Sequence, residues 1–214
     1  MSLDCSKNMI TELDVSKNTS LLRLTCNANR VYDDEKSMYV DYLSSLNVTG
    51  CTALQYLSCY GNALTTLNLS TNTALTWLEC WGNQLSALDV SRNTALTWLV
   101  CGYNRLAALD VSKNTSLVYL WCNDNRLTAL DVSGHRYLKG VYCEESSYLK
   151  TLNVSGCTSL TDLNVSYSVT HLNVSGCTSL QELYTESPFL TELNASGCTA
   201  LLSLYCESDG QGSL

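Results

Sequence analysis

Several residue types are scarce in this 214-residue chain, which has one proline, one phenylalanine and two histidines. Basic side chains are also few, because 12 Lys and Arg stand against 20 Asp and Glu, for a net charge of −8. This balance argues against nucleic acid or an anionic membrane as the partner. No apolar run reaches the length of a transmembrane helix, so we expect no membrane insertion.

A signal peptide is missing as well, because the first residues contain neither its charged segment nor its apolar segment. Met1-Ser2-Leu3 leads directly into a repeat. A truncated or processed protein begins in this way, and so does a natural cytosolic protein. Cys5 and Cys206 belong to repeats close to the two termini, so we expect no natural caps. Either flanking sequence has been removed, or the open edges pair in an oligomer.

Recognisable arrangements for catalysis or metal binding are also missing. His135 and His171 have no predictable serine, cysteine or carboxylate partner for nucleophilic or acid–base chemistry. The 12 cysteines include no Cys-x-x-Cys pair, and no glycine-rich phosphate loop is present. We therefore expect a protein that is not an enzyme and that uses no metal or cofactor.

The chain does contain a sequence repeat. Cysteines recur at 21-residue intervals through its middle, at Cys59, Cys80, Cys101, Cys122 and Cys143. The first four lie in the frame Leu-x-x-Leu-x-Cys-x-x-Asn-x-Leu, and Cys143 lies in a looser copy of it. A Leu-Asp-Val-Ser-x-Asn-Thr segment follows in the most regular copies. The frame gives ten strand positions: 5, 26, 59, 80, 101, 122, 143, 165, 185 and 206. They predict a single domain, residues 1–214, of about ten coils.

Within each repeat the apolar side chains alternate as in a β-strand. Leu78 and Cys80 fall on one face, and Trp77, Glu79 and Trp81 fall on the other. Strands this short bury their apolar face only when identical coils stack, about 4.8 Å apart, with leucine above leucine. The Leu-Asp-Val-Ser segment reads as a second extended stretch, and a 21-residue coil leaves no room for a helix. We expect one parallel sheet that carries all ten positions.

The frame resembles the leucine-rich-repeat motif over essentially the whole chain, with cysteine where the third leucine usually stands. Its 21-residue form is similar to the cysteine-ladder repeats of internalin-type bacterial surface proteins and to repeat proteins of gut anaerobes. The resemblance implies a right-handed solenoid, usually classed as α/β. This solenoid would be mostly β, with the parallel sheet on its concave face, short extended segments on its convex side, and little or no helix.

The same resemblance implies asparagines whose amides satisfy backbone groups where the chain turns out of the sheet. They are Asn8, Asn29, Asn62, Asn83, Asn104 and Asn125. After Cys143 this position holds Ser146, Ser168, Pro188 and Asp209, so we expect less regular coils there. The resemblance also implies a location outside the cell or on its surface, although this sequence shows neither signal nor anchor.

One insertion interrupts the repeat. The interval from Cys26 to Cys59 is 33 residues, which is one repeat plus 12, and the surplus lies near residues 32–42. We expect this acidic and aromatic segment to leave the solenoid as a loop and to contribute to binding. Calcium is the alternative ligand, but the spacing of the carboxylates matches no standard calcium loop. These carboxylates belong to Asp33, Asp34, Glu35 and Asp41.

The register places the cysteines in two columns. Eight occupy the inward strand position: Cys5, Cys26, Cys59, Cys80, Cys101, Cys122, Cys143 and Cys206. Four others replace the asparagine of a second conserved turn: Cys51, Cys157, Cys177 and Cys198. A single column does not converge on a metal ion, and a free cysteine packs as a small hydrophobic residue. We expect these thiols to be buried and reduced.

The outward strand positions carry all four tryptophans. Tyr56, Trp77, Trp98 and Tyr119 form one column over four coils, and the residues beside it are Trp81, Trp121, Tyr103, Tyr142 and Glu79. Aromatic residues suit strands in general, but this preference does not explain why every tryptophan points outward. We therefore predict that these nine residues form the ligand site. Because they face solvent, we expect their truncation to change stability little.

Two ligands fit an aromatic and mildly acidic concave face. A protein partner would use tryptophan and tyrosine as hot spots, and we rank it first. A glycan, which would stack on the rings and bond to carboxylates and amides, is the alternative. A glycoside-active enzyme that pairs Glu79 with Glu144 is a distant third, and a purely structural spacer is fourth. The favoured interpretation is a non-enzymatic, protein-binding module of a bacterial surface or secreted adhesion protein.

Overall fold

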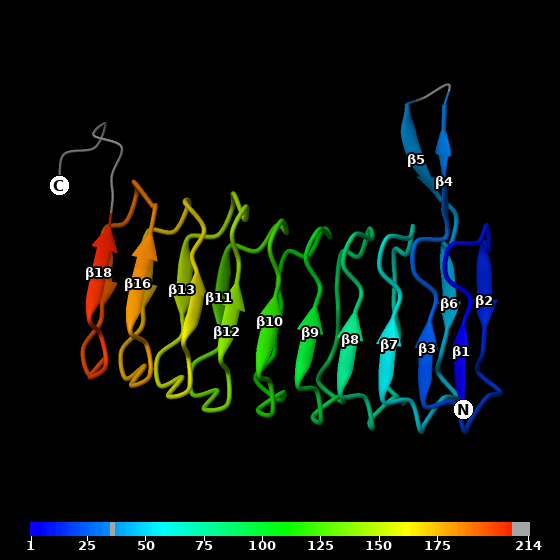
Figure 1. Ribbon diagram of the computed structural model, residues 1–214, viewed down its shortest axis with the longest axis horizontal. Coiled ribbons are helices and arrows are strands. Elements are labelled where there is room, and N and C mark those ends of the chain that lie inside the picture. Colours follow the sequence, from blue (N-terminus) through cyan, green and yellow to red (C-terminus); the bar gives the residue numbers. More distant parts are fainter. Residues whose placement is uncertain (35–36, 207–214) are drawn as a thin grey trace.

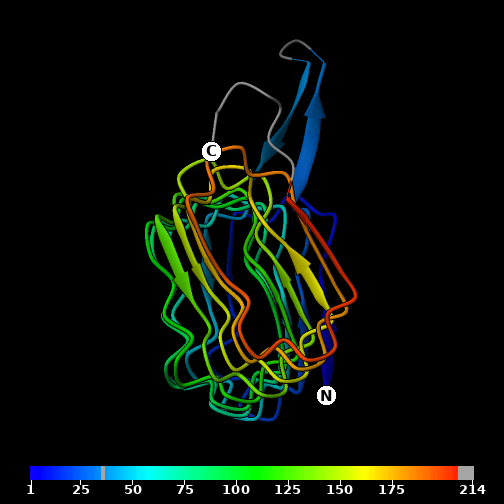
Figure 2. The same ribbon diagram turned by 90° about the vertical axis from the view of Figure 1, so that its left-hand side faces the viewer.

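A computed structural model of the chain describes residues 1–34 and 37–206. Over these residues the chain forms eighteen short strands and no helix. The strands belong to a row of stacked coils, which Figure 1 shows from the side and Figure 2 shows along its length. The mostly β solenoid predicted from the repeat is confirmed. No helix in the described part of the chain is long and apolar enough to span a membrane.

Eight parallel strands form the main sheet, which is the sheet expected on the concave side. In spatial order they are β1 (Ser2–Asp4), β3 (Arg23–Thr25), β7 (Tyr56–Ser58), β8 (Trp77–Glu79), β9 (Trp98–Val100), β10 (Tyr119–Trp121), β12 (Gly140–Tyr142) and β14 (Asp162–Asn164). Equivalent repeat positions pair directly, as Trp77 does with Trp98 and Leu78 with Leu99. Each side chain of the sheet therefore lies beside its own counterpart in the next coil.

Strands on the other side of the coils correspond to the Leu-Asp-Val-Ser segments. The second sheet is parallel and contains β11 (Ala129–Asp131), β13 (Thr151–Asn153), β15 (His171–Asn173) and β17 (Glu192–Asn194). Near the N-terminus, β2 (Glu12–Asp14) pairs with β6 (Ser45–Asn47) in the same way. The extended segments predicted for the convex side are thus present, and His171 lies there as expected.

A single hydrophobic core runs between the two sides. Leucines, valines and cysteines fill it, and both Leu78 and Cys80 are completely buried. The predicted inward register is therefore correct in the middle of the chain. Burial is incomplete at the two ends of the stack, because Cys206 is exposed and Cys5 and Cys198 are only partly buried. These three cysteines lie in coils at the ends of the described stack, where fewer neighbouring coils cover them.

Turn asparagines bond the backbone as the resemblance implied. Asn83 is buried, and its Nδ2 donates to the carbonyl oxygens of Cys59 and Cys80, both at 3.0 Å. Its Oδ1 accepts the backbone N–H of Leu64 at 3.0 Å. One side chain therefore satisfies three backbone groups that the turn removes from water. The bonds to cysteine carbonyls recur at Asn62, Asn104 and Asn125.

Serines replace these asparagines in the C-terminal coils, as expected from the sequence. The hydroxyl of buried Ser168 lies 2.7 Å from the carbonyl oxygens of Ser146 and Leu149. At the next turn Pro188 has no donor to offer. The hydroxyl of the preceding Ser187 takes over and donates to the carbonyl of Tyr167 at 2.8 Å. Asp209, the last member of the series, lies outside the described residues.

The second turn uses asparagine, cysteine or, in one coil, the buried His135, whose ring nitrogens lie 2.9 Å and 3.1 Å from the carbonyl oxygens of Val132 and Val111. Asn72 Nδ2 donates to the carbonyl oxygens of Val48 and Cys51, both at 2.9 Å. In a cysteine-bearing coil the Sγ of Cys177 donates to the carbonyl of Val154 at 3.2 Å. Most cysteine turns also need the preceding glycine, because Gly156, Gly176 and Gly197 have φ between 70° and 74°. An L side chain is disfavoured at that φ, so glycine and cysteine substitute together.

One continuous ten-stranded sheet was expected, and this expectation is wrong in one respect. β16 (Glu182–Thr185) pairs with β18 (Ser203–Cys206) as a separate two-stranded sheet, although β14 and β16 remain neighbours. The break coincides with the one coil that is a residue shorter than the repeat, since Val165 and Thr185 are 20 residues apart.

The insertion is a β-hairpin and not the irregular loop that we expected. β4 (Arg30–Asp33) pairs with β5 (Met38–Asp41) in antiparallel register, with Tyr32 opposite Tyr39 and Val31 opposite Val40. Figure 1 shows the hairpin standing off one edge of the coils, beside the second main-sheet strand. No group of three potential metal ligands occurs among residues 1–34 and 37–206, and Glu35 lies outside them.

The burial of the cysteines leads to a testable prediction about the reactivity of their thiols. It raises the pKa of the Cys101 and Cys143 thiols to about 12, so these side chains stay protonated and unreactive at pH 8. Nine cysteines are buried, two are partly buried and one is exposed. We expect a thiol-specific reagent at pH 8 to modify at most Cys5, Cys198 and Cys206 in the native protein. All 12 cysteines should react after denaturation without reductant. Fewer thiols after denaturation would reveal disulfides, and rapid labelling of the native column would contradict the inward register.

Candidate functional site

Four aromatic rings lie in one column on the solvent side of the main sheet. Ring centroids are 5.8 Å apart between Tyr56 and Trp77, 4.2 Å between Trp77 and Trp98, and 4.8 Å between Trp98 and Tyr119. Trp77 and Trp98 are nearly parallel, with 8° between their planes. The spacing follows from the strand pairing, because each ring starts from the same position of a neighbouring strand.

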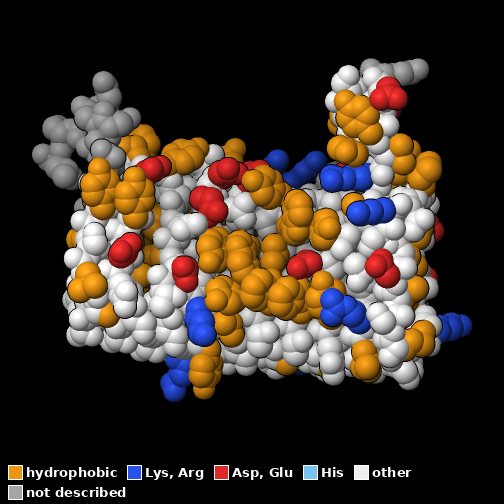
Figure 3. All heavy atoms as spheres, in the orientation of Figure 1, with side chains coloured by type: hydrophobic (Ala, Val, Ile, Leu, Met, Phe, Trp, Pro, Cys, Tyr) orange, Lys and Arg blue, Asp and Glu red, His pale blue; other side chains and the backbone are white. Residues whose placement is uncertain are grey.

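A second pair of rings joins this column at its C-terminal end. Trp121 lies 4.5 Å from Trp98 and 5.4 Å from Tyr119, between ring centroids. Tyr142 stacks on Trp121 at 4.7 Å with an interplanar angle of 5°. Together these six rings form one continuous surface, which we call the aromatic stripe: Tyr56, Trp77, Trp98, Tyr119, Trp121 and Tyr142. Figure 3 shows it as the large hydrophobic area in the middle of this face.

Three further rings form a shorter row where the chain leaves the main sheet. Tyr60 stacks on Trp81 at 4.8 Å, and Trp81 meets Tyr103 edge-on at 6.3 Å. The Tyr103 hydroxyl donates to Glu145 Oε2 at 2.8 Å, and this hydrogen bond raises the pKa of Tyr103. We call Tyr60, Trp81 and Tyr103 the rim row. Trp81 and Tyr103 are exposed, so the rim row extends the accessible aromatic surface.

Polar groups hold Glu79 beside the first ring of the stripe. The Ser58 hydroxyl donates to Glu79 Oε2 at 2.5 Å, and the Tyr56 hydroxyl lies 3.5 Å from the same oxygen. Burial and the Glu79 carboxylate together raise the pKa of Tyr56. Tyr56 therefore keeps its proton at neutral pH and presents a neutral ring to the solvent.

The stripe has a different neighbour at each end of its column. At the N-terminal end, the Arg23 guanidinium carbon lies 3.5 Å from the centre of the Tyr56 ring. At the other end the column reaches Gly140, where an added Cβ would lie 2.8 Å from atoms of both the Tyr119 and the Tyr142 ring. Glycine at this position therefore lets the two rings lie flat against the strand.

The rings are more buried than the sequence suggested. All six stripe residues are partly buried, mainly because each ring covers its neighbour, and Trp77 Nε1 is buried without a hydrogen-bond partner among the described residues. A buried indole N–H without an acceptor is unfavourable, because it has lost the hydrogen bond that it would make to water. Because of this partial burial, we expect truncation of a stripe ring to cost some stability.

The carboxylate pair considered for an enzyme is not brought together. Glu79 and Glu144 lie in coils that are three repeats apart, a separation of about 14 Å at the usual strand spacing. Glycosidase carboxylates lie about 5–10 Å apart. This arrangement gives no support to the glycoside-active alternative.

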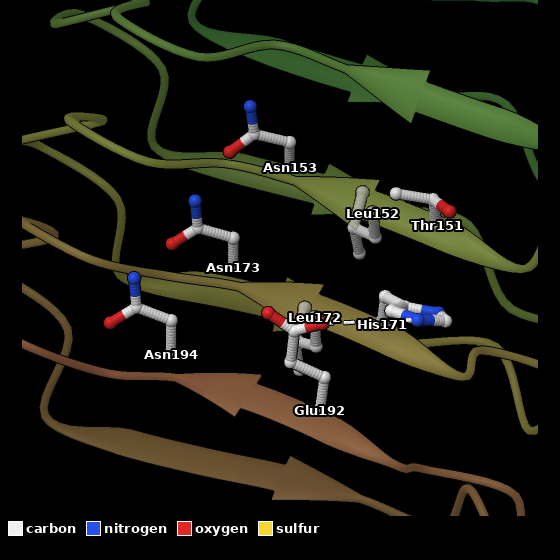
Figure 4. A pocket seen from close by; sticks show the side chains of 8 residues that line it. All are labelled: Thr151, Leu152, Asn153, His171, Leu172, Asn173, Glu192 and Asn194. Atoms are coloured by element: carbon white, nitrogen blue, oxygen red, sulfur yellow. Dashed lines mark ion pairs between the residues drawn. The ribbon is translucent and has the colours of Figure 1, made fainter.

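A shallow groove of about 350 Å³ lies on the second sheet, on the opposite side of the coils. Figure 4 shows Thr151, His171 and Glu192 along one side of it and a row of asparagine amides along the other. His171 Nε2 and Glu192 Oε2 are 3.8 Å apart, and both side chains are more than half exposed. Each asparagine oxygen in the row accepts the N–H of the residue two positions later. The row therefore maintains the turns, and we assign the groove no function.

Comparison with solved structures identifies the repeat type. The functional domain of InlJ from Listeria monocytogenes, which includes a cysteine ladder, is 31% identical, with a TM-score of 0.61 over 95% of this chain. The chain spans only 48% of that domain. It is an internalin-like, cysteine-ladder leucine-rich-repeat protein. The fold also matches the leucine-rich-repeat domain of APL1B (15% identity, TM-score 0.60, 97% of this chain and 72% of that one).

An internalin of the same organism, InlF, gives a TM-score of 0.51 at 18% identity, over 94% of this chain and 71% of that one. At such low identity the match concerns the fold alone. No protein-family model matches the chain. No curated protein sequence matches it either. Folds of this type are generally non-enzymatic scaffolds for protein interaction, and this coarse function is what the comparisons support.

All nine predicted site residues lie on the main-sheet side of this internalin-like chain. Six of them form the stripe, and Glu79 lies at its edge. Trp81 and Tyr103 belong to the rim row instead. Arg23 and Gly140 were not predicted as parts of this surface. Their signal was available, since Arg23 and Gly140 occupy the same repeat position as Trp77.

Neighbouring residues in β9 provide a test of the register. Trp98 points outward into three ring contacts, whereas Leu99 is completely buried. We expect Trp98→Ala to lower the free energy of unfolding by about 1–2 kcal/mol, through lost ring stacking. Leu99→Ala should lower it by about 3–4 kcal/mol, because it leaves a cavity in the core. Urea unfolding measures both. Equal losses, or a larger loss for Trp98→Ala, would show that the ring belongs to the core.

Proposed function

We propose that this leucine-rich-repeat protein recognises a protein partner through the aromatic stripe and the adjoining rim row. The observation that carries the proposal is the position of all four tryptophans on the solvent side of one sheet, in contact with one another or with neighbouring tyrosines. Large rings in such positions add little to the core. They are the residue types that dominate binding energy at protein interfaces.

Rigidity supports this use of the surface. Each stripe ring starts from a strand and stacks against at least one other ring, so it loses little side-chain entropy when a partner covers it. The buried Leu and Cys ladders on the inner side fix those strands. A partner would therefore meet a preformed surface, and the rings would not need to rearrange.

The hairpin gives the proposed interface a second element. Val31, Tyr32, Met38 and Tyr39 are all at least 40% exposed on it. Its base is attached next to the rim row, since the Ala28 N–H donates to the Tyr60 carbonyl at 2.8 Å. A partner that covers the rim row could also contact the hairpin, and we propose that it does so. A surface or secreted adhesion role, in line with the internalin-like repeat, is part of the same proposal.

A glycan is the second candidate ligand. The near-parallel rings of Trp121 and Tyr142, with Glu144 and Asp162 close by, would suit a sugar face and its hydroxyl groups. We rank it below a protein because most of the aromatic surface is too extended for one or two sugar rings. Stacking alone does not separate the two candidates, so the experiment must include both.

The test is a parallel screen on a protein array and a glycan array. Wild-type protein is compared with Trp77→Ala/Trp98→Ala, with a variant that lacks residues 30–41, and with Tyr137→Ala as a control. Tyr137 is an exposed turn residue away from both sheets. We expect wild type and Tyr137→Ala to bind a common protein ligand, and the double variant to lose at least about 100-fold in affinity.

Thermal unfolding must first show that the double variant is folded. Full-affinity binding by that folded variant would refute the proposal. Hits confined to the glycan array would favour the second candidate. Unchanged affinity without residues 30–41 would remove the hairpin from the interface while leaving the stripe in place.

A further inference from the structure

The electrostatic character of the main-sheet face changes along the aromatic stripe. At its N-terminal end a cation is already stacked on a ring, because the Arg23 guanidinium lies 3.5 Å from the centre of Tyr56. The Glu79 carboxylate lies next to the same tyrosine. This corner thus combines an aromatic face, a carboxylate and a guanidinium, all supplied by the chain itself.

The C-terminal end of the stripe has an aromatic face and carboxylates but, among the described residues, no guanidinium on the ring. Tyr142 stacks on Trp121 with one face, and the next coil presents Asp162 and Asn164 beside it in place of another ring. Two carboxylates lie near this ring. The pKa of Tyr142 is raised mainly by burial, and the charges of Asp162 and Glu144 raise it further. No lysine or arginine occupies the strand positions that pair with this end of the stripe.

One oxygen at this end is left without a donor. Glu144 Oε2 is buried and has no hydrogen-bond partner among residues 1–34 and 37–206. A carboxylate with one buried and unbonded oxygen is unfavourable, and a nearby cation would compensate its charge without bonding to that oxygen directly. Asp162 is exposed, with Thr161 Oγ1 donating to its Oδ2 at 2.7 Å, so its other oxygen remains open to a partner.

We propose that the partner places an arginine side chain at this end of the stripe, with its guanidinium over Tyr142, its N–H groups on Asp162 and its charge near the Glu144 carboxylate. The inference rests on the proposed function, because it names the chemistry that the same surface selects. The inference predicts that the partner segment contains an apolar or aromatic stretch, which covers Trp77 to Trp121, and an arginine next to that stretch. The chain's own Arg23 shows the geometry at the opposite end.

Arginine fits this corner better than lysine does. Its planar guanidinium can stack on a ring and still direct several N–H groups at carboxylates in the ring plane. The ammonium of lysine is a more strongly hydrated point charge and gains less from the ring face. A neutral citrulline has a similar shape without the charge, so it is the natural control ligand.

Intrinsic fluorescence can follow this binding, because all four tryptophans lie in the stripe or the rim row. The probe is a blocked Gly-Arg-Gly-Arg-Gly peptide, compared with its lysine and citrulline counterparts. We expect the arginine peptide to change the fluorescence of the wild-type protein, the lysine peptide to bind more weakly, and the citrulline peptide to bind at least about tenfold more weakly.

Two matched variants test whether the arginine peptide binds to Asp162 and Glu144 in particular or to the net negative charge of the chain. Asp162→Asn/Glu144→Gln should weaken the arginine peptide about tenfold. The control Glu12→Gln/Glu192→Gln makes the same change in net charge on strands at the opposite side of the coils, and it should leave the affinity unchanged.

Three results would overturn the inference. They are no response of wild type to the arginine peptide, equal affinity for the citrulline peptide, and equal weakening by the control variant. The wild-type comparison of arginine with citrulline does not depend on how the variants fold. A stripe-dependent partner found on the arrays, together with no arginine preference, would remove this inference and leave the proposed function standing.

Discussion

The in-register stacking of parallel coils is the constraint on which the rest of this structure depends. Each strand of the main sheet is only three residues long, and none could bury its apolar side alone. Pairing of equivalent positions places leucine against leucine and cysteine against cysteine on the inner side. The same pairing aligns Trp77 with Trp98 on the outer side. Core and candidate site are therefore two consequences of one register.

Stacking also limits which residues the turns accept. A buried turn must offer donors to the carbonyls of its own coil and of the previous one, which Asn83 does with one amide. Cys177 offers a single weak donor and needs a left-handed glycine before it. The second turn thus accepts asparagine, cysteine or, in one coil, His135. On the outer surface no such requirement exists, so aromatic residues there are free to serve a partner.

Most of the fold could be predicted from the sequence, because a fixed period and strict alternation determine which side chains face inward. The outward position of the tryptophans followed from the same argument. The hairpin could not be predicted, since the pairing of Tyr32 with Tyr39 depends on contacts outside the repeat. The partial burial of Trp77 was also missed, because alternation gives the face of a residue and not the coverage by its neighbours. Nor did the period reveal that the main sheet would end at β14, with β16 and β18 paired separately.

Oxidative footprinting of the free and the partner-bound protein tests the central claim most directly. The claim is that one register places all four tryptophans on the binding face. The account predicts that the partner protects Trp77, Trp98 and Trp121 from oxidation, while labelling of the exposed turn residue Tyr137 stays the same. Unchanged labelling of these tryptophans, with protection confined to the hairpin or to His171 on the second sheet, would contradict it.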